Sequence, residues 1–223
     1  MAVRDGFHLA ATEYVAPSPR TANGYSLVLP PGWRKIPLRG GTSKVLRALV
    51  KQAFADVTPD VPPDTVSAYR ARFEARLAEM VREARAKGGI DIYLPVMPVY
   101  KSPIAASFIV SEAAFEPADP AGPADPAEIV TLMAAEESSA RTVVVDGAEG
   151  VRVSRVNSPV PGERIDAGSR CLDYILPVPG SSGRWLVIAF STYGGGSPDD
   201  KVATLLSELF EAMMSTFRWG WAA

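Results

Sequence analysis

Hydrophobic residues between positions 43 and 87 recur every three or four places, which is the spacing of amphipathic helices. The first group predicts a helix over residues 43–56, with Thr42 or Ser43 as its N-cap. A second, longer helix is expected to begin at Asp64 and to stop at the Gly88-Gly89 pair, because glycine readily takes the left-handed conformation that ends helices. The stripe expected to be buried on this longer helix comprises Val66, Tyr69, Phe73, Leu77, Met80 and Val81.

After residue 89 the hydrophobic period changes to two through residue 115, which is typical of β-strands. Residues 90–96 and 104–115 are expected to form a hairpin that bends at 97–103. Pro95 and Pro98 cannot donate hydrogen bonds to a neighbouring strand. We therefore expect this stretch at a sheet edge or at a bulge.

Two further hairpins are predicted in the second half of the chain. One joins strands at 142–145 and 151–153 through Asp146-Gly147, a residue pair that favours tight turns. The other joins strands at 170–177 and 184–192 across a turn rich in glycine and serine. Together they predict that much of the second half of the chain is β-sheet.

Shorter elements are predicted near the beginning and in the middle of the chain. The alternation at Tyr25, Leu27 and Leu29 indicates a first strand, and Trp33 after it is expected to lie in the core. Residues 125–133 have the acidic cap, first-turn proline and apolar side of a short helix.

The last helix is the element that the sequence predicts most clearly. Ser197-Pro198 supplies a cap and a first-turn proline, and the helix is expected to run to the Trp219 region. Its apolar stripe comprises Val202, Leu205, Leu206, Leu209, Phe210, Met213 and Phe217.

Composition limits the classes of function. The chain has 223 residues, of which 47% are hydrophobic and 22% charged, a profile typical of a globular protein with one core. We expect a lead-in over residues 1–22, a single domain over 23–221 and an exposed loop at 116–126.

Charge and hydropathy argue against two kinds of partner. A net charge of -2 provides no field for nucleic acid, and neither a secretory signal nor an apolar membrane span is recognisable. We therefore expect neither nucleic acid nor a membrane as a partner. The expected location is cytoplasmic.

Few residues are available for catalysis. Cys171 is the only cysteine, so an internal disulfide is excluded, and His8 is the only histidine and cannot by itself build a zinc site. The Gly194-Gly195-Gly196 run lacks the lysine and hydroxyl residue of a P-loop and predicts a flexible turn instead. We therefore expect no cofactor and no metal, and favour a protein without catalytic activity.

Two charged groups offer alternative sites. Carboxylates that could act as acid and base are Asp146, Glu149, Asp166 and Asp173. Guanidiniums that could bind phosphate or carboxylate are Arg152, Arg155, Arg164 and Arg170. For both groups we favour solvated side chains, because turns and sheet surfaces commonly carry such residues.

Trp219 and Trp221 are the candidate partner-binding residues. Both follow the last clear turn of the predicted final helix, where one indole can be buried more easily than two. Exposed tryptophan is enriched among binding hot spots. The competing interpretation is that Trp221 folds back onto the core or forms a homodimer contact.

The order of the predicted elements resembles that of the Mog1/PsbP-like α/β family, including its LpqN-like and secretion-accessory-like actinobacterial members. The likeness spans residues 23–220 and rests on the Leu29-Pro30-Pro31-Gly32-Trp33 entry, the long hairpin over 172–190 and the closing helix that ends in Phe217-Arg218-Trp219. The resemblance implies an α+β fold in which amphipathic helices cover an antiparallel β-sheet.

The resemblance also implies a function. It suggests a non-catalytic adaptor or chaperone-like protein that binds another protein, linked to a secretion or effector system. The alternative is a small-molecule-binding or hydrolytic protein that uses a pocket between sheet and helices, with Asp173, Tyr174 or Cys171 inside it. A deep pocket with convergent polar groups would favour the alternative, whereas a broad exposed apolar sheet face would favour the adaptor.

Overall fold

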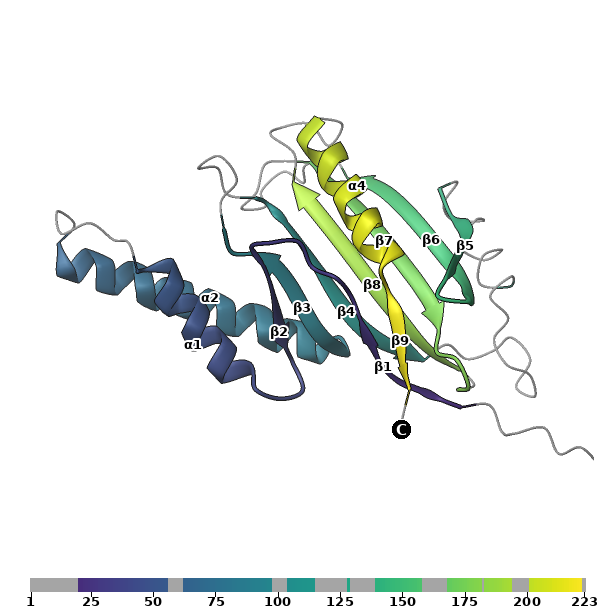
Figure 1. The fold of residues 1–223 in the computed structure, drawn as a ribbon. Helices are drawn as coiled ribbons and strands as arrows, with labels where there is room; N and C mark the ends of the chain where they lie inside the picture. Colours follow the sequence, from purple (N-terminus) through teal and green to yellow (C-terminus); the bar gives the residue numbers. More distant parts are fainter. Residues whose placement is uncertain are drawn as a thin grey trace, which may run out of the picture.

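The computed structural model describes residues 20–55, 62–97, 104–114, 128, 139–157, 168–181, 183–193 and 201–221. Its main strands are β2 (Trp33–Pro37), β3 (Gly89–Pro95), β4 (Ala106–Ala114), β5 (Arg141–Val145), β6 (Ala148–Asn157), β7 (Ser169–Pro177) and β8 (Arg184–Tyr193). They form one antiparallel seven-stranded sheet in the order β2-β3-β4-β8-β7-β6-β5 (Figure 1). Two short strands, β1 (Ala22–Ser26) and β9 (Arg218–Trp221), pair with each other as a separate two-stranded ribbon.

The helices lie on both faces of the large sheet. Helices α1 (Thr42–Ala53) and α2 (Pro63–Ala86) pack beside β2 and β3, whereas α4 (Lys201–Ser215) lies over β7 and β8 (Figure 1). Alternate side chains of β4 point to opposite faces of the sheet. Phe108 and Val110 belong to the core under α4, whereas Ile109 packs with the core under α1 and α2. The predicted α+β class is confirmed.

Stacked aromatic rings fill the core between α4 and the sheet. Phe210 is fully buried, and its ring lies nearly parallel to that of Phe190 at 4.7 Å between centroids. The rings of Phe108 and Tyr174 contact the same side chain at 5.4 Å and 5.8 Å. Because Phe210 meets residues of three strands at once, it holds α4 on the sheet.

The ribbon is attached to this core through both of its strands. Tyr25 of β1 lies opposite Trp219 of β9, and its ring stacks on that of Phe217 with 5.7 Å between centroids. The backbone N–H of Ala22 donates to the carbonyl of Pro179 at 2.9 Å. Strands from opposite ends of the sequence are thus held side by side (Figure 1).

The predicted hairpins are confirmed. Strands β3 and β4, β5 and β6, and β7 and β8 each pair antiparallel. Asp146 and Gly147 both have positive φ angles, 46° and 80°, as the predicted tight turn requires.

Two further predictions are confirmed. Trp33 is buried in the core as expected. Gly88, with φ 76°, follows α2 in the left-handed conformation that the sequence predicted for the helix stop.

Several helix boundaries differ from the prediction. Helix α1 begins at Thr42 because Gly41, in the left-handed conformation, is its N-cap, and the Thr42 hydroxyl donates to the carbonyl of Pro37 instead of capping. Helix α2 begins at Pro63, so Asp64 lies in its first turn rather than at its cap.

The predicted stripe of α2 is buried only in part. Tyr69 and Phe73 are 59% and 36% exposed, whereas Leu77 and Val81 are buried. The residues of α2 that belong to the core with Ile92 of β3 all lie in its second half. Only this half is packed on the sheet, which is why apolar residues of the first half remain exposed.

Two strand predictions need correction. The first strand covers Ala22–Ser26 instead of the alternation from Tyr25 to Leu29, because its partner is β9. Strand β3 lies between β2 and β4 and not at the sheet edge, while the alternative of a bulge is met only at its start, where the register with β4 shifts between Gly89 and Asp91. Pro95 is tolerated there because it is the last residue of β3.

The final helix is rotated relative to its predicted stripe and is shorter. Val202 and Leu205 are exposed, and Leu206 and Leu209 are only partly buried. The helix ends at Ser215, and residues expected to continue it form β9 because β1 offers a backbone partner. The buried residues of α4 are Ala203, Ser207, Phe210, Met213 and Met214.

Some predicted features lie outside the described residues. They are most of the lead-in at 1–22, the proline-rich loop at 116–126, the glycine run at 194–196 and the helix at 125–133 apart from Glu128, which is helical. These stay predictions.

Candidate functional site

A cavity of about 270 Å³ lies between the ribbon and the large sheet. We call it the ribbon cavity. Its walls come from both strands of the ribbon, from β2, β3, β4 and β8, and from the segments that follow β2 and β7. Polar groups from distant parts of the sequence therefore converge on one space. The polar or charged side chains that line it include Asn23, Tyr25, Lys35, Arg39, Asp91, Glu112 and Arg184.

A buried carboxylate belongs to the wall of the ribbon cavity. Asp91 is 3% exposed, and its Oδ2 accepts hydrogen bonds from the Lys35 ammonium at 2.8 Å and from the Tyr25 hydroxyl. The Tyr25 hydroxyl also lies 3.0 Å from that of Tyr93. We call these four residues the Asp91 cluster. A buried charge is costly unless it is paired and hydrogen-bonded, and here both conditions are met.

Burial determines the protonation of the Asp91 cluster. It raises the pKa of the Tyr25 and Tyr93 hydroxyls above the ordinary value. Burial acts to lower the pKa of Lys35, but the hydrogen bond to Asp91 and the neighbouring groups outweigh it, so this pKa is raised overall. At neutral pH the two phenols keep their protons and Lys35 stays charged. Protonated phenols and a charged ammonium can donate hydrogen bonds to a polar molecule, but they cannot act as a base that removes a proton from it.

Two guanidiniums and one carboxylate form the rim of the cavity. Glu112 accepts from Arg39 Nη2 through Oε2 and from Arg184 Nε through Oε1, each at 2.7 Å. These two hydrogen bonds hold the pKa of Glu112 below its ordinary value. We call these three residues the rim triad. Its two positive charges exceed its single negative charge, so the rim is positive.

Trp219 contributes an aromatic wall to the ribbon cavity. Its side chain packs edge to face on Phe217, with 4.9 Å between centroids. The indole Nε1 is buried and has no hydrogen-bond acceptor among the described residues. Buried polar atoms usually have a partner, so this donor distinguishes Trp219 from an ordinary core residue.

The two tryptophans predicted to bind a partner lie in different environments. Trp219 is 6% exposed and belongs to the main core, so its indole is not at the surface. Trp221 is 47% exposed and pairs with Ala22 of β1. A direct role in binding a partner stays a prediction, and the exposure of Trp221 makes it the better placed of the two.

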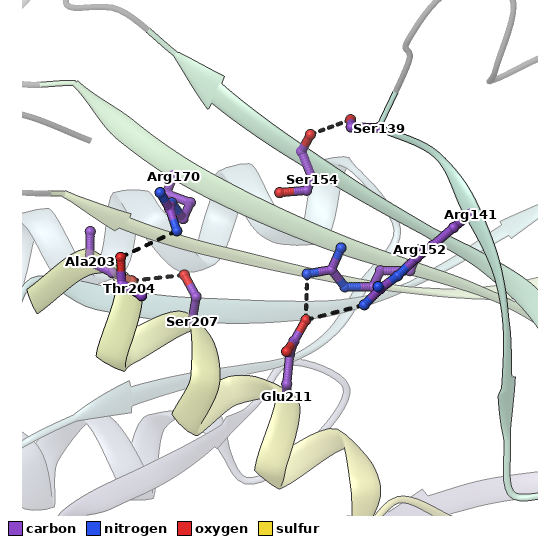
Figure 2. A network of polar contacts seen from close by, with 9 residues as sticks. All are labelled: Ser139, Arg141, Arg152, Ser154, Arg170, Ala203, Thr204, Ser207 and Glu211. Carbon is purple, nitrogen blue, oxygen red and sulfur yellow. Dashed lines mark hydrogen bonds and ion pairs between the residues drawn. The ribbon is translucent and has the colours of Figure 1, made fainter. Parts of the chain in front are cut away.

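The arginines considered as an anion-binding group do not converge. Arg152 and Arg170 face α4, where they contact Glu211 and Thr204 respectively (Figure 2). On β6 the alternation of side chains sends Arg152 and Arg155 to opposite faces of the sheet. The group therefore does not form one anion site. Its fourth member, Arg164, lies outside the described residues.

The carboxylates considered as an acid and base pair are also apart. Asp146 lies in the turn between β5 and β6, and Glu149 is exposed at the start of β6. Asp173 lies on β7 and pairs with Arg155 at 2.7 Å. Asp166 is outside the described residues. The three described carboxylates of this group therefore form no joint acid and base site.

The cysteine does not have the surroundings of a nucleophile. Burial raises the pKa of the Cys171 thiol, so the neutral thiol prevails at neutral pH. Its sulfur lies 3.4 Å from the side-chain amide nitrogen of Asn157, and His8 is outside the described residues.

Metal sites and membrane spans were also considered. In the described ranges, no group of three or more metal-ligating side chains occurs, and no helix has the length and apolar composition for a membrane span.

The residues that line the ribbon cavity were not predicted from the sequence as a site. Asp91 lies between two isoleucines in a strand, where an acidic residue is unusual enough to be a signal. Lys35 and Glu112 also lie within strands. No local pattern indicates that these residues converge. Lys35, Asp91 and Glu112 are brought together by the pairing of β2, β3 and β4, and the pairing of β1 with β9 adds Tyr25.

Comparison of the chain with known proteins identifies no family for it. No protein-family model matches the chain, and no curated protein matches it either. The fold and the ribbon cavity define an α+β protein with an antiparallel sheet and, beside it, a cavity lined by both polar and apolar residues.

Proposed function

We propose that the protein is a non-catalytic binding protein whose ribbon cavity takes a small polar molecule. The observation that supports this best is the convergence of the Asp91 cluster and the rim triad on one cavity of about 270 Å³. Ligand sites are typically concave, partly apolar and equipped with a few fixed polar groups. The paired charges and protonated phenols are suited to binding and orienting a ligand rather than to transforming it.

A cavity-filling variant tests this proposal. Ile90 lines the ribbon cavity with a partly buried apolar side chain, so Ile90→Trp adds bulk to the cavity wall. The matched control is Val144→Trp on β5, where the side chain is exposed and does not line the cavity, and a thermal unfolding curve shows whether each variant keeps its fold. Ligand-observed NMR with a mixture of small acids, alcohols, amines and sugars would detect binding.

The expected result is that at least one compound binds to the wild type and to Val144→Trp but not to Ile90→Trp. Binding that survives in Ile90→Trp would place the site elsewhere. If no compound binds to the wild type, the proposal that the cavity takes a small molecule fails.

The adaptor or chaperone-like role is the second candidate function. It is supported by the exposed indole of Trp221 on the ribbon and by the resemblance to the Mog1/PsbP-like family. In this proposal the protein acts in the cytoplasm with a secretion or effector system, and Trp221 binds another protein or a second copy of the chain.

Two measurements test the role of Trp221. Affinity capture with the wild type, Trp221→Ala and the similarly exposed control Val156→Ala should recover a partner that only Trp221→Ala loses. Sedimentation analysis of the same three proteins tests the homodimer. If neither measurement distinguishes Trp221→Ala from the control, the adaptor proposal through this residue fails.

A further inference from the structure

We infer that the ribbon cavity selects a small organic carboxylate, whose charged end lies at the guanidiniums of Arg39 and Arg184 and whose apolar end lies inside. This inference rests on the proposed function, because it names the class of the small molecule. It is supported by the charge balance of the lining, the remaining hydrogen-bond donors, the pairing of the carboxylates and the apolar wall.

The charge balance of the cavity lining favours an anion. Three positive side chains line it, Lys35, Arg39 and Arg184, against two negative ones, Asp91 and Glu112. The difference is one positive charge. Complementary charge steers a ligand toward a site and suppresses binding of the wrong sign, so an anion is preferred over a neutral molecule or a cation.

The guanidiniums of Arg39 and Arg184 have N–H groups that Glu112 does not engage. Glu112 engages Nη2 of Arg39 and Nε of Arg184, which leaves both terminal nitrogens of Arg184 and one of Arg39 without a hydrogen bond to that carboxylate. A guanidinium presents five N–H donors in a planar fork that matches two carboxylate oxygens. Glu112 engages one nitrogen of each arginine, so both guanidiniums lie side by side at the same carboxylate.

The two carboxylates of the lining are poor sites for a cation. Asp91 is buried and already paired with the Lys35 ammonium at 2.8 Å, and it also accepts from Tyr25. Glu112 holds a guanidinium at each oxygen. A ligand ammonium would have to displace one of these partners, which leaves a charge uncompensated.

The apolar residues of the lining indicate that the uncharged end of the ligand is a hydrocarbon group. Ile90, Val178 and Leu186 contribute apolar side chains to the same cavity, and Pro37 adds to them. Such a wall suits a short hydrocarbon chain.

A matched set of three probes tests the class of ligand. Hexanoate, 1-hexanol and hexylamine share one chain length and differ only in the head group and its charge. Their dissociation constants for the full chain can be measured by ligand-observed NMR at neutral pH and low salt. We expect hexanoate to bind about tenfold more tightly than either of the others and to weaken as salt is added.

Two variants separate recognition from folding. Arg39→Gln removes an exposed rim guanidinium, and Arg47→Gln is the control because Arg47 is an exposed arginine on α1 that does not line the cavity. Arg39→Gln should reduce the preference for hexanoate over 1-hexanol, whereas Arg47→Gln should keep it. A thermal unfolding curve for each variant shows whether the fold is retained.

The outcomes distinguish this inference from the proposed function. Equal binding of the three probes, or a preference for hexylamine, overturns the carboxylate inference and leaves a small-molecule site in place. If none of the three binds while another compound binds in the cavity, the carboxylate inference is again overturned. If hexanoate binds equally to the wild type and to a folded Ile90→Trp, the ribbon cavity is not its site, and neither proposal holds for hexanoate.

Discussion

The carboxylate of Asp146 accepts a hydrogen bond from the backbone N–H of Trp219 at 2.8 Å. Asp146 belongs to the turn between β5 and β6 and has a φ of 46°, while Trp219 lies in β9. The turn therefore holds the C-terminal strand of the ribbon in place. Because Trp219 also lines the ribbon cavity, this contact connects a hairpin at the far edge of the sheet with the candidate site.

Removal of the Asp146 carboxylate should destabilise the protein. In Asp146→Ala the Trp219 amide loses its acceptor, and because this hydrogen bond is partly buried its loss should cost about 1 kcal/mol of unfolding free energy. Asp146→Asn is the matched control, since its side-chain oxygen can still accept. Urea unfolding of the three proteins provides the measurement. Equal midpoints for Asp146→Ala and the wild type would show that the contact contributes nothing to stability.

The packing of α4 leads to a second prediction. Phe210 is fully buried among three other rings, whereas Leu205 on the same helix is 62% exposed. Phe210→Ala should lower the free energy of unfolding by about 3–5 kcal/mol through lost burial and a cavity. Leu205→Ala should change it by less than about 0.5 kcal/mol. Urea unfolding of both variants measures the difference, and similar losses would mean that another face of α4 is packed on the sheet.

The same helix illustrates how far the sequence predicts the fold. The three- and four-residue spacing located α4 but assigned Val202 and Leu205 to the same stripe as Phe210. In an apolar helix several faces have similar hydrophobicity, and the choice between them depends on the shape of the sheet beneath. The hairpins were predicted more accurately because the Asp146-Gly147 turn and the period of two are local signals.

The candidate site was predicted far less well than the hairpins. Tyr25, Lys35, Asp91 and Glu112 come from four different strands, and no spacing in the sequence connects them. Asp91 lies on the face of β3 opposite to Ile92, where it meets Tyr25 of β1, and β1 is held there by its pairing with β9. Such a pairing between two distant segments of the chain leaves no periodic pattern in the sequence.

A close approach between β6 and β7 leads to a third prediction. A Cβ at Gly150 would meet the carbonyl oxygen of Ile175 and come within 2.8 Å of Leu176 Cδ2. Gly150→Ala should therefore cost about 1–3 kcal/mol through overpacking. At Gly40 a Cβ would meet nothing within 4 Å among the described residues, so Gly40→Ala is the control. Thermal unfolding of both variants tests this, and an unchanged melting temperature for Gly150→Ala would contradict the predicted clash.

The Asp91 cluster should make the protein sensitive to alkaline pH. Burial raises the pKa of the Tyr25 hydroxyl, while in the unfolded chain it ionises near its ordinary value of about 10. Below that pH both states hold the proton, and stability from this group is fully present. Above it the unfolded state releases its proton first, so the free energy of unfolding falls by about 1.4 kcal/mol per pH unit for each such proton. Tyr93 and Lys35, whose pKa values are also raised, act in the same direction.

The contribution of Tyr25 can be isolated by the slope of stability against pH. Tyr25→Phe loses the hydrogen bond to Asp91 and should be less stable than the wild type at neutral pH, but its stability should fall less steeply above about pH 10 because one titrating group is gone. Tyr69→Phe is the control, since that side chain is exposed and lies on α2 away from the cluster. Urea unfolding from neutral to about pH 11 gives the slopes. If Tyr25→Phe and the wild type lose stability in parallel over the alkaline range, the buried hydroxyl does not retain its proton and the protonation argued for the Asp91 cluster is wrong.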